Sequence, residues 1–349
     1  MGDSVKKREC GIDILRCIAL FLVTVLHSFK YNGFYGVAQN GIFVLFADSV
    51  RWLSYSCVGL FLLITGYLKS TKSINRKWFW DLIPILVSYL LTCCISFPIR
   101  HFFLGDPLPL KDWIIKFLSF GNYAWYVEMY IGLMLICPIV NLALEQLKEP
   151  KQLLLAAGVA VFVTALPTVT VWPIIPDYWT AIWPITYYII GAVIRRLQPR
   201  VGVFKGICTI LTLMLGMGMI SMLSTDSVFD DSFQYNNGIW VTCMATVIFI
   251  TFYQIRPNDS IRKIAAWMAG GCFEGYLLSR LLDVVVYSWV PQWHDPQKYF
   301  LIWLFVTLPV FLVSVVMGKL THTYTVWIMG FVNRVSNSIR LAFQKIIEQ

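Results

Sequence analysis

The sequence is poor in charged residues, which make up only 13% of its 349 positions, whereas hydrophobic residues make up 58%. A soluble domain of this length could not bury so many apolar side chains, so the composition indicates a polytopic membrane protein. Histidine is also scarce, with four residues, and none stands at metal-ligand spacing from the nine cysteines. We therefore expect no metal site, and we interpret the cysteines as small buried apolar residues.

A signal-peptide cleavage site is missing as well. No small-residue cleavage motif follows the basic segment MGDSVKKREC, so the first apolar run is expected to remain as a membrane span. Apolar windows of about 20 residues then recur along the chain. They predict an all-α fold with about ten transmembrane helices, near 11–30, 48–68, 78–98, 124–144, 152–170, 178–198, 204–224, 238–255, 264–286 and 299–319. Residues 1–320 would form the transmembrane domain, and residues 321–349 a basic amphipathic tail in the cytoplasm.

The net charge of +9 is unevenly distributed over the predicted loops. Of the 28 lysines and arginines, twenty fall in segments on the N-terminal side of the membrane, six on the other side, and two within spans. This bias predicts that both termini are cytoplasmic. The charge is thus a topology signal, and we expect no nucleic-acid partner. The absence of an internal repeat or of an inverted pair of broken helices weakens the case for a secondary transporter.

Two ionisable residues interrupt the first apolar run, LRCIALFLVTVLHS. Ten residues separate Arg16 from His27, so a helix places both on nearly the same face, about 16 Å apart. Asp13 precedes Arg16 by three residues and can pair with it. A guanidinium suits a phosphate group, and a histidine side chain can take a proton from a hydroxyl group. Alternatively, Arg16 extends to the lipid headgroups and His27 is an interfacial residue.

Four segments resemble motifs of the membrane-bound acyltransferase-3 family, and they occur in the family's order. GIDILRCIALFLVTVLHS resembles its first span, in which D-x-x-R is followed by ten residues and a histidine. The other three are VGLFLLITGYL at 58–68, AWYVEMYIGLMLICPIV at 124–140 and YYIIGAVIRR at 187–196. The resemblance implies ten spans and transfer of an acyl group, most often acetyl, from cytoplasmic acyl-CoA to a hydroxyl group of a surface glycan.

The resemblance also implies roles for individual residues. His27 would be the catalytic histidine, either as general base or as carrier of the acyl group. Arg16 would contact the CoA end and Asp13 would orient Arg16. Basic residues after the second span would attract the CoA phosphates, namely Lys72, Arg76 and Lys77.

Further polar residues lie within the predicted spans. Glu128 is expected to face the bundle, where it could orient His27, bind sugar hydroxyls or make a structural hydrogen bond. Ser279 stands where many relatives carry a histidine. Arg280 and Asp283 follow on the same helix, three residues apart, and are expected to pair.

The sequence therefore predicts a multi-pass O-acetyltransferase of the bacterial plasma membrane, without a fused soluble esterase-like domain. Acetyl-CoA would be the co-substrate, no metal would be needed, and a glycan or lipid-linked glycan would be the acceptor. A polytopic transporter of a small anion or of a proton-coupled substrate is the alternative, because a cavity with buried Arg, His and Glu could serve it equally. A non-catalytic sensor module is a further alternative, which the intact Arg16 and His27 pair disfavours.

Overall fold

The computed structural model describes residues 8–36, 38, 40–73, 75–105, 111, 114–115, 120–169, 175–224, 236–290 and 296–347. Within these residues the regular elements are helices, so the predicted all-α class is confirmed. The α-helices are α1 (Cys10–Tyr31), α2 (Ile42–Ser54), α3 (Ser56–Lys69), α4 (Arg76–Trp80), α5 (Ile83–Leu104), α7 (Phe120–Gln146), α8 (Pro150–Thr164), α9 (Trp183–Leu197), α10 (Val203–Ser224), α11 (Ile239–Phe252), α12 (Asp259–Ala269), α13 (Cys272–Tyr287) and α14 (Pro296–Ile347). Short 3₁₀ helices lie at Phe34–Gly36, Leu166–Thr168 and Asp177–Ile182.

In the described part of the chain, seven helical segments are long and apolar enough to cross a membrane. They are Cys10–Tyr31, Ile42–Lys69, Lys77–Leu104, Ala124–Gln146, Pro150–Thr168, Val203–Leu223 and Phe305–Val335. The polytopic architecture is thus confirmed. Three windows of the sequence prediction give shorter helices: α9 has 15 residues, α11 has 14, and the window 264–286 is divided between α12 and α13. The count of ten spans and the location of the termini remain predictions.

Local sequence signals set several helix boundaries. The side chain of Asn75 accepts a hydrogen bond from the backbone N–H of Trp78 at the start of α4, and Asn258 does the same for α12. Glu149 and Gln152 form a capping box at the start of α8. At the end of α5, Gly105 takes a left-handed conformation with φ of 67°, which a residue without Cβ adopts at little cost.

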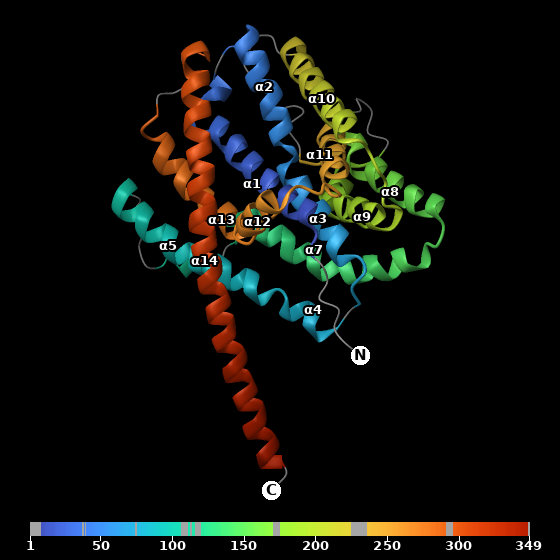
Figure 1. Ribbon diagram of the computed structural model, residues 1–349, viewed down its shortest axis with the longest axis vertical. Coiled ribbons are helices and arrows are strands. Elements are labelled where there is room, and N and C mark those ends of the chain that lie inside the picture. The colour runs from blue at the N-terminus through green and yellow to red at the C-terminus, as the bar shows by residue number, and fades with distance from the viewer. Residues whose placement is uncertain are drawn as a thin grey trace.

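Helix α1 lies inside the bundle, where it contacts α2, α3, α11, α12, α13 and α14 (Figure 1). Apolar residues such as Leu15 and Ala19 are buried on it, and so is Asp13. Because α1 is surrounded by helices, its polar side chains face protein and internal cavities rather than the outside of the bundle. The polar face that the sequence predicts is therefore placed where ionisable groups are tolerated.

Two glycines allow α3 and α9 to pack closely. A Cβ added at Gly66 would overlap the backbone of Tyr188, and one at Gly191 would overlap the backbone of Leu63. Each glycine belongs to one of the motifs described above, ITGYL and YYIIGAVIRR. The two helices approach so closely that both positions require a residue without a side chain.

Helix α14 is continuous over 52 residues, and its C-terminal part extends away from the other helices (Figure 1). The predicted boundary between residues 320 and 321 falls inside this helix. Beyond that boundary, Thr325 still contacts Ser88 of α5, and His322 contacts Glu274 of α13. The first part of the predicted tail is therefore attached to the bundle, and its assignment as a separate segment stays a prediction.

Candidate active site

The histidine that the sequence singles out has a carboxylate as its partner. Nδ1 of His27 lies 2.7 Å from Oδ2 of Asp283 on α13. The Asp283 side chain is fully buried, whereas that of His27 is 26% exposed. An ionised carboxylate only accepts hydrogen bonds, so with Asp283 ionised Nδ1–H is the donor and the lone pair is on Nε2. The imidazole is thereby oriented as a general base or a nucleophile.

The expected pairing of Asp283 with Arg280 is wrong. The structure pairs Asp283 with His27 instead, because α13 packs alongside α1. Oδ1 of Asp283 has no hydrogen-bond partner among the described residues. Arg280 lines the small cavity beside His27, together with Lys30, Tyr276 and other residues; its volume is about 120 Å³, and we call it the histidine cavity. Two cations thus stand next to the imidazole.

A larger and more apolar cavity lies on the Arg16 side of the histidine cavity. This central cavity has a volume of about 840 Å³ and is lined by Arg16, Phe61, Tyr126, Tyr276 and residues of α5, α13 and α14. Tyr276 lines both the central and the histidine cavity. Its ring packs edge-on against that of Tyr126, with 5.4 Å between the centroids. The two tyrosines therefore form the wall between the cavity that contains Arg16 and the cavity that contains His27.

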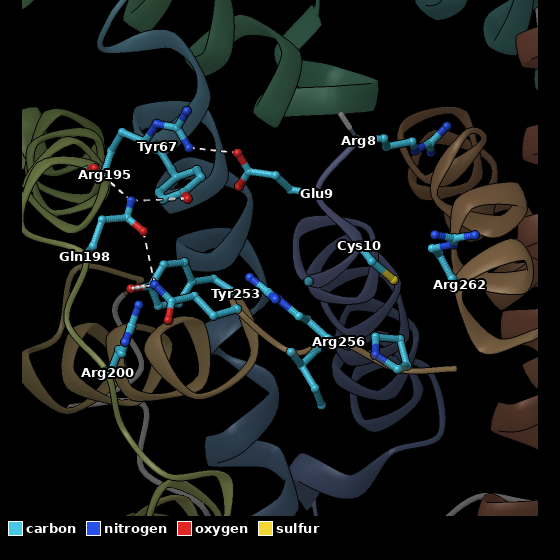
Figure 2. A pocket seen from close by; sticks show the side chains of 14 residues that line it. Arg8, Glu9, Cys10, Tyr67, Arg195, Gln198, Arg200, Tyr253, Arg256 and Arg262 are labelled. Carbon is cyan, nitrogen blue, oxygen red and sulfur yellow. Dashed lines mark hydrogen bonds and ion pairs between the residues drawn. The ribbon is translucent and has the colours of Figure 1, made fainter. Parts of the chain in front are cut away.

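A third cavity, larger than the central one, lies at the start of α1 and has a volume of about 1130 Å³ (Figure 2). We call it the arginine basin because five arginines line it, Arg8, Arg195, Arg200, Arg256 and Arg262. A smaller cavity of about 220 Å³ shares Arg8 with the basin and shares Arg8 and Arg16 with the central cavity. The cavities therefore follow one another from the basin to His27, with shared residues at each step.

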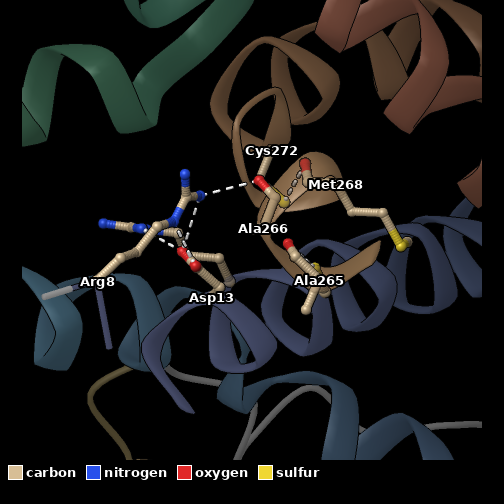
Figure 3. A network of polar contacts seen from close by, with 8 residues as sticks. Arg8, Asp13, Ala265, Ala266, Met268 and Cys272 are labelled. Atoms are coloured by element: carbon tan, nitrogen blue, oxygen red, sulfur yellow. Dashed lines mark hydrogen bonds and ion pairs between the residues drawn. The ribbon is translucent and has the colours of Figure 1, made fainter. Parts of the chain in front are cut away.

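Asp13 is the centre of an ion-pair network at this junction (Figure 3). It is 1% exposed, and its carboxylate accepts hydrogen bonds from Nε of Arg8 at 2.5 Å and from Nη1 of Arg16 at 3.0 Å. Arg8 also donates to the carbonyl oxygen of Ala266. The hydrogen bond to Asp13 raises the pKa of Arg8 above its ordinary value, so Arg8 stays cationic. The predicted pairing of Asp13 with Arg16 is confirmed.

The central cavity contains a second pair of a histidine and a carboxylate. Nδ1 of His322 lies 2.9 Å from Oε1 of Glu274, and the hydroxyl group of Ser88 donates to the same oxygen at 2.8 Å. Glu274 is 4% exposed, so these contacts replace the water that a carboxylate would otherwise bind. The side chain of His322 is 38% exposed, and it lines the central cavity from α14.

Two of the three residues predicted to bind the CoA phosphates, Lys72 and Lys77, do not line these cavities. Both lysines are exposed. The side chain of Arg76 lies outside the described residues. Among the described side chains that the sequence assigns to the CoA end, Arg16 is the one that lines a cavity.

Glu128 is not brought to the site either. It is exposed on α7, on the helix face that carries Leu135, Ile139 and Leu142, which are exposed too. The opposite face of α7 carries the buried residues Tyr126, Leu133 and Cys137. Their spacing follows the 3.6-residue repeat of a helix. The expectation that Glu128 faces the bundle is thus not met, and a role for it in catalysis stays a prediction of the sequence alone.

The family model of an acyltransferase domain, that of the acyltransferase-3 family, matches residues 11–319. The chain belongs to this family. No curated protein and no solved structure matches it. This acyltransferase-3 protein is therefore a membrane acyltransferase, and neither the transporter nor the sensor alternative gains support. No group of three or more His, Cys, Asp or Glu residues in the described part of the acyltransferase could hold a metal ion.

Proposed function

We propose that this acyltransferase moves an acetyl group from acetyl-CoA to a hydroxyl group of a cell-surface or cell-wall glycan, which is free or lipid-linked. The observation that carries the proposal is the His27–Asp283 pair beside a chain of cavities that begins in an arginine-lined basin. The positive-inside bias supports a cytoplasmic position for the basin and an outer position for His27 in a bacterial plasma membrane. CoA and the acceptor would thus approach from opposite sides.

In the proposed reaction, Nε2 of His27 takes the proton from the acceptor hydroxyl group, and the hydroxyl oxygen attacks the thioester carbonyl carbon. The carbon–sulfur bond then breaks, the ester remains on the acceptor, and the imidazolium returns its proton to the departing CoA thiolate. Asp283 would stabilise the imidazolium that forms, as the carboxylate does in other histidine–carboxylate pairs. Lys30 and Arg280, which line the histidine cavity, would favour the oxyanion of the tetrahedral intermediate.

A second route uses the same residues. Nε2 would attack the thioester itself, release CoA thiolate and carry the acetyl group as an acyl-imidazole until the acceptor hydroxyl group takes it. Both routes need His27 with Nδ1 held by Asp283. They differ in whether label from acetyl-CoA becomes attached to the protein before an acceptor is present.

The test uses the full chain in nanodiscs with acetyl-CoA radiolabelled in the acetyl group. CoA release and label on the protein are followed for wild type, His27→Ala and Arg16→Ala. We expect His27→Ala to abolish transfer, and Arg16→Ala to raise the KM for acetyl-CoA. Label on wild-type protein that His27→Ala abolishes supports the acyl-imidazole route. Transfer that is independent of both residues contradicts the proposal.

A further inference from the structure

The arginine basin has more positive charge than its own carboxylates balance. Five arginines line it, and Glu9 is the one acidic residue among the lining residues. Figure 2 shows Arg195 and Arg200 on one side of the cavity and Arg8 and Arg262 on the other. These side chains come from the start of α1, the end of α9 and the segments around α12, which are far apart in the sequence.

Three of the five arginines have carboxylate partners. Glu9 is 2.8 Å from Nη1 of Arg195, Asp13 pairs with Arg8, and Asp259 lies 3.0 Å from Nη2 of Arg262. Among the described residues, no carboxylate pairs with the other two, Arg200 and Arg256. Two guanidinium groups without a counter-charge in a large, solvent-accessible cavity favour a ligand with several negative charges.

The rest of the lining suits an aromatic heterocycle next to those charges. Tyr67 and Tyr253 line the basin, with 5.7 Å between their ring centroids, and the guanidinium of Arg195 lies 4.7 Å from the centroid of the Tyr67 ring. The side-chain amides of Gln254 and Gln198 are linked at 3.0 Å. Aromatic rings and guanidinium planes stack on a base, and side-chain amides can form hydrogen bonds with the polar atoms at its edge. The volume of about 1130 Å³ is slightly above the usual range of about 300–1,000 Å³ for small-molecule sites.

The basin adjoins the proposed route of the acyl group through shared lining residues. Arg8 and Arg195 line both the basin and the smaller cavity, and Arg8 and Arg16 line both the smaller and the central cavity. A molecule with a polyanionic head and a long uncharged arm fits this series of cavities. Its head would contact the basin arginines, and its arm would pass Asp13 and Arg16 into the apolar central cavity.

We propose that the arginine basin binds the nucleotide end of acyl-CoA, with Arg200 and Arg256 on its phosphates. This inference rests on the proposed function, and it moves the phosphate site away from Lys72, Arg76 and Lys77, which the sequence suggests. An anionic lipid headgroup shares the phosphate chemistry. We favour the nucleotide because the tyrosines and glutamines of the basin suit stacking and hydrogen bonding with a base. A lipid headgroup has no aromatic base.

The first experiment measures binding of adenosine 3′,5′-bisphosphate, which is the nucleotide end of CoA without its arm. The full chain is placed in nanodiscs of zwitterionic lipid, and titration calorimetry compares wild type with Arg200→Gln and Arg256→Gln. Each substitution removes a charge-assisted contact and is expected to weaken binding about tenfold. Lys205→Gln is the matched control, because Lys205 is an exposed cation near the basin segments that lines none of the cavities described above.

No binding by wild type, or equal binding by the arginine variants, overturns the inference. The same titration in nanodiscs with anionic lipid tests the rival ligand. If anionic lipid completely abolishes binding of the bisphosphate by wild type, the basin binds a lipid headgroup, and the inference of a nucleotide site is overturned. If Lys72→Gln or Lys77→Gln loses affinity for the bisphosphate and the arginine variants do not, the CoA phosphates bind at the site that the sequence suggests.

A turnover experiment separates this inference from the proposed function. The arginine variants are expected to raise the KM for acetyl-CoA about tenfold and to leave turnover of acetyl-pantetheine, which has no nucleotide, unchanged. If wild type turned over neither compound but still bound the bisphosphate through Arg200 and Arg256, the nucleotide site would stand and acetyl transfer would fail. If the arginine variants lost activity equally with acetyl-CoA and with acetyl-pantetheine, nucleotide binding in the basin would be contradicted.

Discussion

Asp283 on α13 lies 2.7 Å from His27 on α1, although 256 positions separate the two residues in the sequence. A fully buried carboxylate with one contact loses the water that would otherwise solvate it, and the imidazole N–H is the group that compensates for this loss. The pair therefore fixes which ring nitrogen of His27 carries the proton. It links α1, which bears the first family motif, to α13, where the sequence predicts a pairing of Asp283 with Arg280 instead.

The substitution Asp283→Asn tests this positioning role. An amide can donate to Nδ1 and so favour the tautomer with the proton on Nε2, which cannot act as a base. We expect kcat to fall about 100-fold or more while the KM for acetyl-CoA is unchanged. Steady-state kinetics of the purified variant measure both constants.

Thermal denaturation of the same variant separates positioning from folding. The neutral amide avoids the burial of a charge, so the Tm is expected to stay the same or to rise. A kcat within twofold of wild type would show that His27 does not depend on Asp283. A large fall in Tm together with the loss of activity would assign Asp283 a structural role instead.

What the sequence predicts correctly is local or periodic. The helical class and the shared face of Arg16 and His27 follow from hydrophobic windows and from the 3.6-residue repeat. The Asp13–Arg16 pair follows from a spacing of three residues, and the structure has it at 3.0 Å. The same rule fails for Asp283, because tertiary packing offers His27 as a partner in competition with the neighbour on its own helix.

Other parts of the site depend on which helices pack together, and no spacing rule indicates that. Glu274 and His322 are 48 positions apart and meet only because α13 packs against α14. The arginine basin collects side chains from several segments, whereas the sequence suggests one basic loop after the second span. A cluster that forms only in three dimensions cannot be distinguished, in the sequence, from the basic residues that orient a membrane protein.

Tyr276 offers a test of the passage between the central and histidine cavities, since it lines both. Tyr276→Ala removes most of that wall. We expect kcat/KM for butyryl-CoA to rise about tenfold relative to that for acetyl-CoA, because each added methylene then finds space. Tyr178→Ala is the control, since Tyr178 is 72% exposed and should leave the ratio unchanged. A constant ratio in Tyr276→Ala would place the acyl group elsewhere.

Asp13→Asn tests the ion-pair network at the start of α1. Asp13 is buried between Arg8 and Arg16, and the substitution leaves both cations without a carboxylate partner in the described part of the chain. We expect the free energy of unfolding to fall by about 1–2 kcal/mol, because both arginines are partly solvated and the loss is screened. The KM for acetyl-CoA should rise several-fold as Arg16 loses its orientation. A lower Tm with an unchanged KM would limit Asp13 to a structural role.

The close packing of α3 on α9 predicts how the acyltransferase responds to single methyl groups. Gly66→Ala and Gly191→Ala each insert a Cβ into the backbone of the other helix, so the helices must separate. We expect each substitution to destabilise the protein by about 1–3 kcal/mol, the usual cost of overpacking. Gly132→Ala is the matched control, because Gly132 lies in α7 and has nothing within 4 Å of an added Cβ. An alanine there should stabilise the helix by about 0.5–1 kcal/mol.

Thermal denaturation in one detergent, with the three variants measured side by side, checks this prediction. Because all three replace glycine by alanine within a helix, the gain in helix propensity is common to them and only the packing differs. The Tm values should therefore fall on opposite sides of wild type. If Gly66→Ala and Gly191→Ala were as stable as Gly132→Ala, α3 and α9 could not approach as closely as the structure has them. The glycines of the two motifs would then need a functional explanation instead of a structural one.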